Sequence, residues 1–305
     1  MKILVFTEKP FAPAAVKAIA NTINASGNEM VLVENGTRAD LLEAVKDADG
    51  LIVRSDKIDN EVMNAAPKLR VIVRAGAGYD NIDLAAATEH KICVMNTPGQ
   101  NSNAVAELVF GMMVMMCRNR YNGKSGSELK GKSLGIYAFG QVGRNVARIA
   151  KGFGMKVMAL DVFVADAVME AEGVVPVHDV NDLFSQNDYV SLHIPATPQT
   201  RNSIGYDLVM KMPKNGVLVN TARKEVIDEE GLIKALEERP DLRYISDIKP
   251  DRAEEFEQKF ADRVFFTPKK MGAQTAEANF NAGVAAAEQS IAYLTEGWNK
   301  YQVNK

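Results

Sequence analysis

The chain has 305 residues, of which 47% are hydrophobic and 25% are charged, and its formal net charge at pH 7 is -3. This length is typical of two domains, and the apolar content is enough for sizeable cores. The slightly negative charge, without a long basic tract, argues against a nucleic-acid partner. Cys93 and Cys117 both lie in apolar stretches, so we expect no disulfide framework and a cytoplasmic location.

The first third of the chain alternates between short apolar runs and helical patterns. Buried strands are expected at residues 3–6, 31–33, 50–53, 71–73 and 92–94, with helices at residues 14–23, 39–45, 61–65 and 84–89. This alternation predicts an α/β domain with a doubly wound parallel sheet. The initial run MKILVF is expected to be a strand rather than a leader, because no cleavage-site pattern follows it.

An apolar stretch from about Val105 to Cys117 separates this series from the next one. It is too short to cross a bilayer and contains Glu107, so we expect a buried helix and no membrane association. Its methionines are expected to fill a core or an interface rather than to bind a metal.

A second alternating series begins at Leu134. Strands are expected at residues 134–138, 157–160, 189–192, 217–219 and 244–246, with helices at residues 142–151, 206–210 and 229–236. These elements predict a second doubly wound parallel sheet. The alanine-rich stretch from Ala276 to Leu294 predicts a long, closely packed helix, and its periodicity leaves open which domain it joins.

A glycine turn, Ala138-Phe-Gly-Gln-Val-Gly143, connects the first strand of this series to its helix. Such a turn lets backbone N–H groups reach a pyrophosphate, and the helix N-terminus stabilises the phosphate charge. Asp161 follows the next strand, where an acid can bond ribose hydroxyls. Ala138 stands where the first glycine of the fingerprint belongs, so a tight turn without a ligand is the alternative. The order of strand, turn, helix, strand and acid favours a dinucleotide site.

Polar side chains follow several of the predicted strands. Arg54 and Arg74 follow strands of the first domain, and Arg223 and Asp247 follow strands of the second. Ligands of open α/β sheets bind beyond the carboxyl ends of strands, and the arginine fork suits carboxylate or phosphate. Two arginines on adjacent strand ends favour an anion site, whereas pairing with an acid such as Asp80 is the alternative.

Six segments of the chain resemble the D-2-hydroxyacid dehydrogenases. They are residues 50–55, 73–83, 94–102, 193–195, 220–223 and 226–232. Within that family, the first three are most similar to the D-3-phosphoglycerate dehydrogenases. The resemblance implies a Rossmann NAD-binding domain, residues 98–282, inserted into a discontinuous flavodoxin-like substrate domain, residues 1–97 and 283–305. It also implies a homodimer that forms through the nucleotide domains.

The resemblance assigns roles to the residues that match its motifs. Substrate-binding positions are Arg54, Ser55, Arg74, Gly76, Ala77 and Asn101. Cofactor-binding positions are Gly140, Gln141, Val142, Gly143, Asp161, His193, Pro195, Ala222, Asp247 and Gly272. Arg223 matches the catalytic arginine, which polarises the substrate carbonyl. The expected cofactor is NAD rather than NADP, because a phosphate at the ribose 2′ position would meet like charge at Asp161. No metal ligands are expected.

The chain departs from the family at the catalytic base. The family's P-H-x-G histidine is absent, and Arg252 stands at the position of its partner glutamate. Counting back from Gly272 places Lys270 on the histidine, whereas counting on from the preceding proline selects Lys269. We expect Lys270, because the glycine backbone must pass close to the nicotinamide, and a lysine needs no carboxylate to fix a tautomer. Two solvated lysines without activity are the alternative.

Lys270 must be neutral to accept the proton of a 2-hydroxyl group. An unperturbed lysine has a pKa of about 10.4, so we expect burial and a neighbouring cation such as Arg223 to lower it.

The resemblance implies NAD-dependent oxidation of 3-phospho-D-glycerate to 3-phosphohydroxypyruvate, the first step of serine biosynthesis. Arg54 and Arg74 favour a substrate with an anionic group beyond its carboxylate. The alternatives are another D-2-hydroxyacid dehydrogenase, such as a hydroxypyruvate/glyoxylate reductase, and an NADH-sensing corepressor without enzymatic activity. Because the sequence ends soon after Trp298, we expect no regulatory domain of the kind that longer relatives carry there. The segment from Arg118 to Gly131 is shorter than in many relatives, so it does not decide whether a dimer arm is present.

Overall fold

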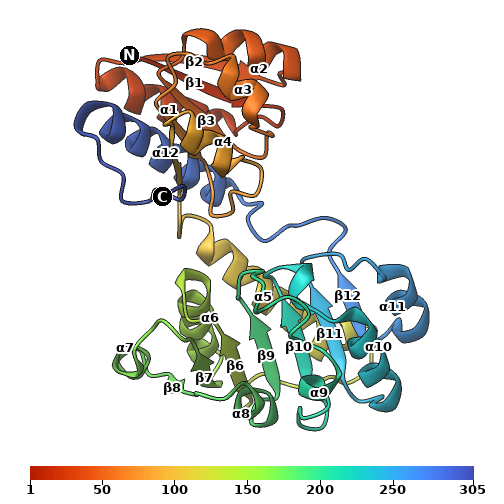
Figure 1. Cartoon of the computed structure of the whole chain (residues 1–305). Helices are drawn as coiled ribbons and strands as arrows, with labels where there is room; N and C mark the ends of the chain where they lie inside the picture. Colours follow the sequence, from red (N-terminus) through yellow and green to blue (C-terminus); the bar gives the residue numbers. More distant parts are fainter. The chain divides into compact units, whose positions relative to one another are not determined.

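The chain forms two compact units. The computed structural model describes all residues from Met1 to Lys305. Unit 1 consists of Met1–Asn101 and Gln274–Lys305, and unit 2 consists of Ser102–Ala273. Unit 2 is therefore inserted into unit 1, as the colours along the chain show in Figure 1.

The unit boundaries differ from the predicted divisions at 97/98 and 282/283. Helix α12 (Ala276–Glu296) packs along α1 (Pro13–Ala25), so its first turns belong to unit 1 as well. The packing is close: a Cβ atom at Gly283 would lie 2.7 Å from the side chain of Ile19. A small residue at this position lets the two helices approach.

Unit 1 is built on a parallel sheet of five strands with the order β2-β1-β3-β4-β5. The strands are β1 (Lys2–Thr7), β2 (Glu29–Glu34), β3 (Gly50–Val53), β4 (Val71–Arg74) and β5 (Cys93–Asn96). The predicted doubly wound sheet is confirmed, with the flavodoxin-like order. The expected burial of all five strands is wrong for β2, because this edge strand is partly exposed along its length.

Helices cover both faces of this sheet (Figure 1). Helices α1 and α12 pack on one face, and α2 (Arg38–Ala44), α3 (Asn60–Asn64) and α4 (Leu84–Glu89) pack on the other. A short 3₁₀ turn, η1 (Val45–Asp47), follows α2. Beyond α12, the side chain of Asn304 binds the backbone at the start of β5: its Oδ1 accepts from Val94 N at 2.9 Å, and its Nδ2 donates to the carbonyl oxygen of Ile92, directly before the strand, at 2.8 Å.

Unit 2 is built on a parallel sheet of seven strands with the order β12-β11-β10-β9-β6-β7-β8. The strands are β6 (Ser133–Tyr137), β7 (Lys156–Leu160), β8 (Val175–Pro176), β9 (Tyr189–Leu192), β10 (Val217–Asn220), β11 (Arg243–Ser246) and β12 (Val264–Phe266). The predicted second doubly wound sheet is confirmed. The sequence missed β8 and β12, which are the two short edge strands.

Two layers of helices enclose the sheet of unit 2. One layer consists of α5 (Ser102–Cys117), α6 (Gln141–Gly152) and α7 (Asp166–Ala171). The other consists of α8 (Val180–Ser185), α9 (Tyr206–Val209), α10 (Glu229–Glu238) and α11 (Ala253–Phe260). Two 3₁₀ turns, η2 (Asn119–Tyr121) and η3 (Lys224–Val226), complete the unit.

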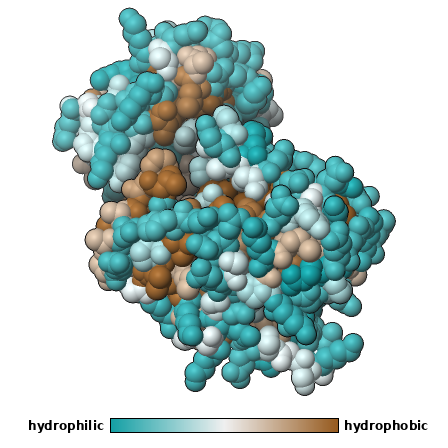
Figure 2. Space-filling view, turned by 60° about the horizontal axis from the view of Figure 1, so that its bottom comes forward, coloured by the Kyte–Doolittle hydropathy of each residue, from teal (hydrophilic) through white to brown (hydrophobic).

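The predicted methionine-rich helix is confirmed as α5, which begins at Ser102 and buries Met112, Met113 and Met116 in the core. Cys93 and Cys117 are buried and form no disulfide, and burial raises the pKa of the Cys93 thiol to about 11. None of the helices combines the length and hydropathy that crossing a bilayer requires. Most of the face drawn in Figure 2 is hydrophilic.

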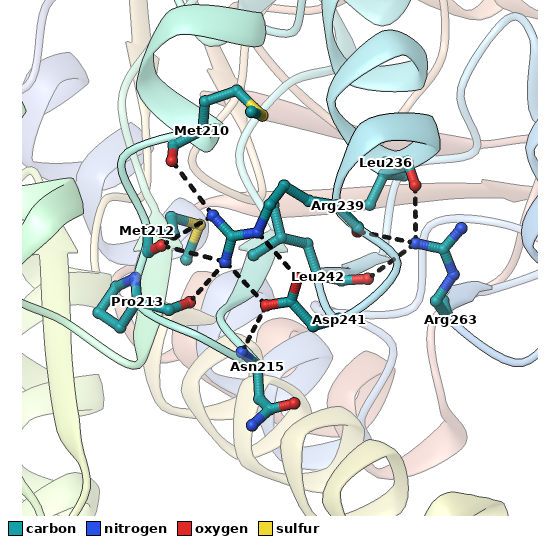
Figure 3. A network of polar contacts seen from close by, with 9 residues as sticks. All are labelled: Met210, Met212, Pro213, Asn215, Leu236, Arg239, Asp241, Leu242 and Arg263. Carbon is teal, nitrogen blue, oxygen red and sulfur yellow. Dashed lines mark hydrogen bonds and ion pairs between the residues drawn. The ribbon is translucent and has the colours of Figure 1, made fainter.

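An arginine–aspartate pair connects the amino ends of β10 and β11, and Arg263, directly before β12, donates to the carbonyl oxygen of Arg239 at 3.1 Å (Figure 3). The Arg239 guanidinium donates to both carboxylate oxygens of Asp241, at 2.8 and 2.7 Å, and also to the carbonyl oxygens of Met210, Met212 and Pro213. Asp241 additionally accepts from Asn215 N at 2.8 Å. The hydrogen bonds from Arg239 hold the pKa of the Asp241 carboxyl well below its usual range. The strand ends opposite to this network carry the candidate site residues.

Candidate active site

The predicted site residues lie at the carboxyl ends of parallel strands in each unit, where ligands of open α/β sheets bind. In unit 1, Arg54 follows β3 and Arg74 ends β4. In unit 2, the glycine turn follows β6, and further site residues follow β7, β9, β10 and β11. Each sheet thus collects its predicted residues along a single edge.

Arg54 is anchored within unit 1. Its Nη1 donates to Lys9 O at 3.0 Å and to Pro10 O at 2.9 Å, and its Nη2 donates to Asn279 Oδ1 at 2.6 Å. The guanidinium carbon lies 5.1 Å from the centre of the Phe11 ring, and burial lowers the pKa of the guanidinium. These bonds use both Nη1 hydrogens and one Nη2 hydrogen, so the Nε hydrogen and the second Nη2 hydrogen do not bond to Lys9, Pro10 or Asn279.

Arg74 is tied to Arg54 and lies over Gly76. Its Nε donates to Arg54 O at 2.9 Å. Gly76 has φ +145°, and a Cβ atom there would lie only 1.4 Å from Arg74 Nη1. The backbone angle favours glycine at this position, and a side chain there would displace the Arg74 guanidinium.

The other predicted substrate positions surround these arginines in sequence. Ser55 is exposed, and Asn101 is half-buried at the end of the first segment of unit 1. The carbonyl oxygen of Ala77 accepts from Asn96 Nδ2 at 2.6 Å, and that of Gly76 accepts from Thr97 N at 3.0 Å. These bonds join the loop after β4 to the end of β5.

The glycine turn after β6 leads directly into α6. Gly140 is the N-cap of α6, and Gln141 and Val142 are the first residues of that helix. A Cβ atom at Gly143 would lie 2.3 Å from the carbonyl oxygen of Ala138, so only glycine permits this close contact of helix and strand. Ala138 has φ +81°, a left-handed angle that costs an alanine about 1–2 kcal/mol.

Asp161 holds two backbone segments at once. Its Oδ2 accepts from Phe139 N at 2.7 Å, and its Oδ1 accepts from Phe163 N at 2.8 Å and Val164 N at 3.2 Å. The carboxylate therefore connects the turn after β6 to the loop after β7. The side chain of Phe163 is 94% exposed in this loop.

Asn220, which the sequence reasoning missed, shapes the turn that carries Arg223. Its buried side chain accepts from Ala222 N at 2.9 Å and donates to Arg223 O at 3.0 Å. Ser246 Oγ donates to the carbonyl oxygen of Asn220 at 3.0 Å, which ties this turn to β11. Arg223 itself is half-buried. An asparagine directly before a turn was the available signal, because its side chain can bond to backbone two residues on.

His193 lies between two hydroxyl groups. Its Nε2 is 2.9 Å from Ser191 Oγ, and its Nδ1 is 3.4 Å from Thr221 Oγ1. Burial lowers the pKa of the imidazole to about 3, so the ring is neutral at physiological pH. The ring connects β9 to the turn after β10, and Pro195 is exposed two residues further on.

Asp247 anchors the segment that carries the two candidate lysines. Its Oδ1 accepts from Thr267 Oγ1 at 2.9 Å and from Met271 N at 2.7 Å, and its Oδ2 accepts from Gly272 N at 2.8 Å. Lys270 and its neighbour Lys269 are exposed, so the expected burial of Lys270 is not found. Pro268 at the start of this segment is exposed as well.

Arg252, at the position of the family's glutamate, pairs with Glu255 through bonds of 2.8 and 2.7 Å. Its backbone N–H donates to Glu229 Oε2 at 2.8 Å. Arg252 stands at the N-cap position of α11, without a side-chain capping bond. No group of three or more histidine, cysteine, aspartate or glutamate side chains is arranged to hold a metal ion.

The sequence and fold of unit 2 define a family. Residues 103–269 match the family model of the NAD-binding domain of D-isomer-specific 2-hydroxyacid dehydrogenases. The chain belongs to the D-2-hydroxyacid dehydrogenase family, and unit 2 is its NAD-binding domain.

The similar proteins include enzymes with two different activities. A D-3-phosphoglycerate dehydrogenase from Methanocaldococcus jannaschii is 40% identical over 268 residues, which cover 83% of this chain and 51% of that protein. A hydroxypyruvate reductase from Thermotoga maritima is 34% identical over 278 residues, which cover 85% of this chain and 89% of that protein. This chain thus spans about half the length of the first relative and most of the second.

Among solved structures, the NAD+-bound 3-phosphoglycerate dehydrogenase of Entamoeba histolytica is 49% identical. The match covers 100% of this chain and 99% of that chain, with a TM-score of 0.90. The fold predicted from the sequence is therefore the fold of this family.

Proposed function

We propose that the chain oxidises 3-phospho-D-glycerate to 3-phosphohydroxypyruvate with NAD+ as the hydride acceptor. The substrate assignment rests on the linked pair Arg54 and Arg74, joined by the 2.9 Å bond from Arg74 Nε to Arg54 O. Two guanidinium groups at adjacent strand ends suit a ligand with two anionic groups. The M. jannaschii and E. histolytica relatives support the same substrate.

The residues of unit 2 fit a dinucleotide. The turn geometry at Gly140 and Gly143 leaves backbone N–H groups at the start of α6 for a pyrophosphate. Asp161 would accept hydrogen bonds from the adenine ribose hydroxyls, and Asp247 would accept one from the carboxamide. Pro195 and Ala222 would lie beside the nicotinamide. When bound, NAD+ supplies the ring that accepts the hydride.

The proposed chemistry uses two basic side chains, Arg223 and Lys270. Arg223 would hold the substrate carboxylate and stabilise negative charge that develops at the C2 oxygen. Neutral Lys270 would remove the proton of the 2-hydroxyl group while the hydride leaves C2. In the reverse direction, charged Lys270 would return that proton. This assignment makes oxidation depend on the neutral fraction of Lys270.

A comparison of substrates tests the proposal. We expect kcat/KM with NAD+ and 3-phospho-D-glycerate to exceed that with D-glycerate by on the order of 100-fold, since the lost charge-assisted bonds are worth about 1.5–3 kcal/mol. Faster turnover of unphosphorylated hydroxypyruvate or glyoxylate would instead favour a reductase like the T. maritima relative, which this chain covers to 89%. Binding of NADH without turnover of any of these acids would favour the corepressor alternative.

We also propose a homodimer that forms through unit 2. Phe153 is 40% exposed and stacks on Phe110 at 5.1 Å, which presents apolar surface beside α5 and α6. Sedimentation equilibrium is expected to give twice the chain mass, and a monomer at all concentrations would contradict this assembly.

A further inference from the structure

We propose that Asp247 is the positioning residue for Lys270, acting through the two backbone N–H groups that directly follow the lysine. The inference rests on the proposed function, in which Lys270 is the base. It assigns Asp247 a task beyond any contact with the cofactor: the carboxylate sets the path of the segment from Thr267 to Gly272.

One segment of the chain supplies all the hydrogen bonds to the Asp247 carboxylate. The residue is 1% exposed, and its three bonds come from one hydroxyl group and two backbone N–H groups of the 267–272 segment. Burying a carboxylate is costly unless its oxygens are satisfied, and N–H groups that donate to an ion make strong bonds. All three side-chain bonds of Asp247 therefore hold the 267–272 segment. The backbone carbonyl of Asp247 adds a fourth contact, since it accepts from Thr267 Oγ1 at 2.8 Å.

Peptide geometry transmits this anchoring to Lys270 in particular. The N–H group of Met271 lies in the same planar peptide unit as the Cα atom of Lys270. The 2.7 Å bond from Met271 N to Asp247 Oδ1 therefore fixes the plane from which the lysine side chain departs. The Cα atom of Lys269 belongs to the preceding peptide unit and is not fixed in this way.

Gly272, two residues after the lysine, lies in close contact with the Asp247 carboxylate. A Cβ atom at Gly272 would lie 2.9 Å from Asp247 Oδ2 and 3.2 Å from the side chain of Val105. Lys270 itself is exposed, and the bonds of Asp247 to the two following N–H groups fix the backbone from which its side chain extends. Arg252, at the position of the family's glutamate, is engaged with Glu255 instead.

The test uses Asp247→Asn in the full chain, with Asp241→Asn as the matched control. An asparagine keeps one acceptor oxygen but turns an NH2 group toward a backbone N–H donor. Asp241 also lies in unit 2 and accepts several hydrogen bonds, at the opposite strand ends. Amide hydrogen exchange of Met271 and Gly272, kcat against pH, and NADH affinity are measured for both variants and the wild type.

We expect Asp247→Asn to speed exchange at Met271 and Gly272 by about tenfold or more, as loss of one such bond implies. The kcat for oxidation should fall by on the order of 10- to 100-fold, and the midpoint of its rise with pH should move. Thr267→Val, which leaves both backbone bonds in place, should show a smaller effect of the same kind. Asp241→Asn should lower thermal stability without moving the pH midpoint or the exchange of the two amides.

Two outcomes would overturn the inference. Unchanged exchange at Met271 and Gly272 would show that Asp247 does not anchor the segment. Weaker NADH binding with an unchanged kcat and pH midpoint would reduce Asp247 to a cofactor contact. A wild-type protein that binds NADH but oxidises no 2-hydroxy acid would refute the proposed function instead, and the exchange data would still decide whether Asp247 anchors the segment.

Discussion

The carboxylate of Asp161 accepts a hydrogen bond from the backbone N–H of Phe139 at 2.7 Å, across the turn between β6 and α6. The residue proposed to select the cofactor thus also holds the turn proposed to receive its pyrophosphate. The proposed ribose contact at Asp161 and the proposed phosphate contact at the turn are therefore linked through this hydrogen bond. This connection affects how substitutions of Asp161 must be interpreted.

Asp161→Ala is expected to weaken NADH binding and to narrow the preference for NADH over NADPH. The preference should narrow by on the order of tenfold or more, because the variant lacks the carboxylate that would repel the 2′-phosphate of NADPH. The affinity falls for both cofactors because the bond to Phe139 N is lost as well. Fluorescence titration with each dinucleotide measures both effects. A wild-type preference for NADPH would show that the role given to Asp161 is wrong.

Arg54→Ala is expected to reduce kcat/KM for 3-phospho-D-glycerate more than for D-glycerate, by about 1.5–3 kcal/mol or on the order of 10- to 100-fold. Asn279→Ala is the matched control, because it removes a structural partner of Arg54 and leaves the guanidinium in place. The control should keep the wild-type preference. Equal losses on both substrates in Arg54→Ala would exclude a phosphate contact.

Lys270→Ala is expected to lower kcat for oxidation by about 10²–10⁴-fold, the usual contribution of a general base. NADH binding should persist, because the turn that would hold the pyrophosphate lies elsewhere in unit 2. In the wild type, the oxidation rate should rise with pH as the lysine loses its proton. Lys269→Ala should have a much smaller effect. If the two variants exchanged these outcomes, Lys269 would be the base, and normal turnover in both would exclude a lysine base.

Ala138→Val is expected to destabilise the protein by more than the cost that alanine already bears there. The left-handed angle of φ +81° is worse for a β-branched side chain, and we expect a loss of about 2 kcal/mol or more. Ala138→Gly should be neutral or slightly stabilising, because relief of the angle offsets the greater freedom of the unfolded chain. Chemical denaturation measures both. An equal stability of all three proteins would mean that the angle carries no cost.

Stability is expected to fall in acid partly because of His193. The folded imidazole has a pKa of about 3, whereas an unfolded histidine has the ordinary value of about 6.5. Between these values the unfolded chain binds the proton and the folded chain does not, so stability rises with pH across this window. The difference amounts to about 2 kcal/mol at about pH 5. His193→Gln should flatten denaturation midpoints between about pH 4 and 7 relative to the wild type; an unchanged slope would contradict this.

The sequence predicted the parts of the site that depend on local order. The run of strand, turn and helix around Gly140, and the acid at Asp161, follow from short-range patterns that the sheet then places at one edge. Partners distant in sequence could not be predicted. Arg54 is held by Asn279, which is 225 residues away, and nothing near either residue indicates that contact.

Side chains that act on their own backbone were also missed. Asn220 ends a strand and bonds forward to the turn that carries Arg223, and the sequence analysis gave this asparagine no role of its own. The exposure of Lys270 differs from expectation for a related reason. Periodicity reports which face of a helix or strand is buried, but the 267–272 segment has neither structure, and its course depends on Asp247.

The insertion of unit 2 into unit 1 has a consequence for synthesis on the ribosome. All of unit 2 is contiguous, so it can fold as soon as residue 273 has emerged. The sheet of unit 1 is made first, but α12, one of the two helices on one of its faces, arrives after the whole of unit 2. Until then, apolar side chains such as Val71 and Val73 of β4 stay uncovered on that face. The first domain to be translated is therefore the last to be completed, and it is the one we expect to need protection from aggregation during translation.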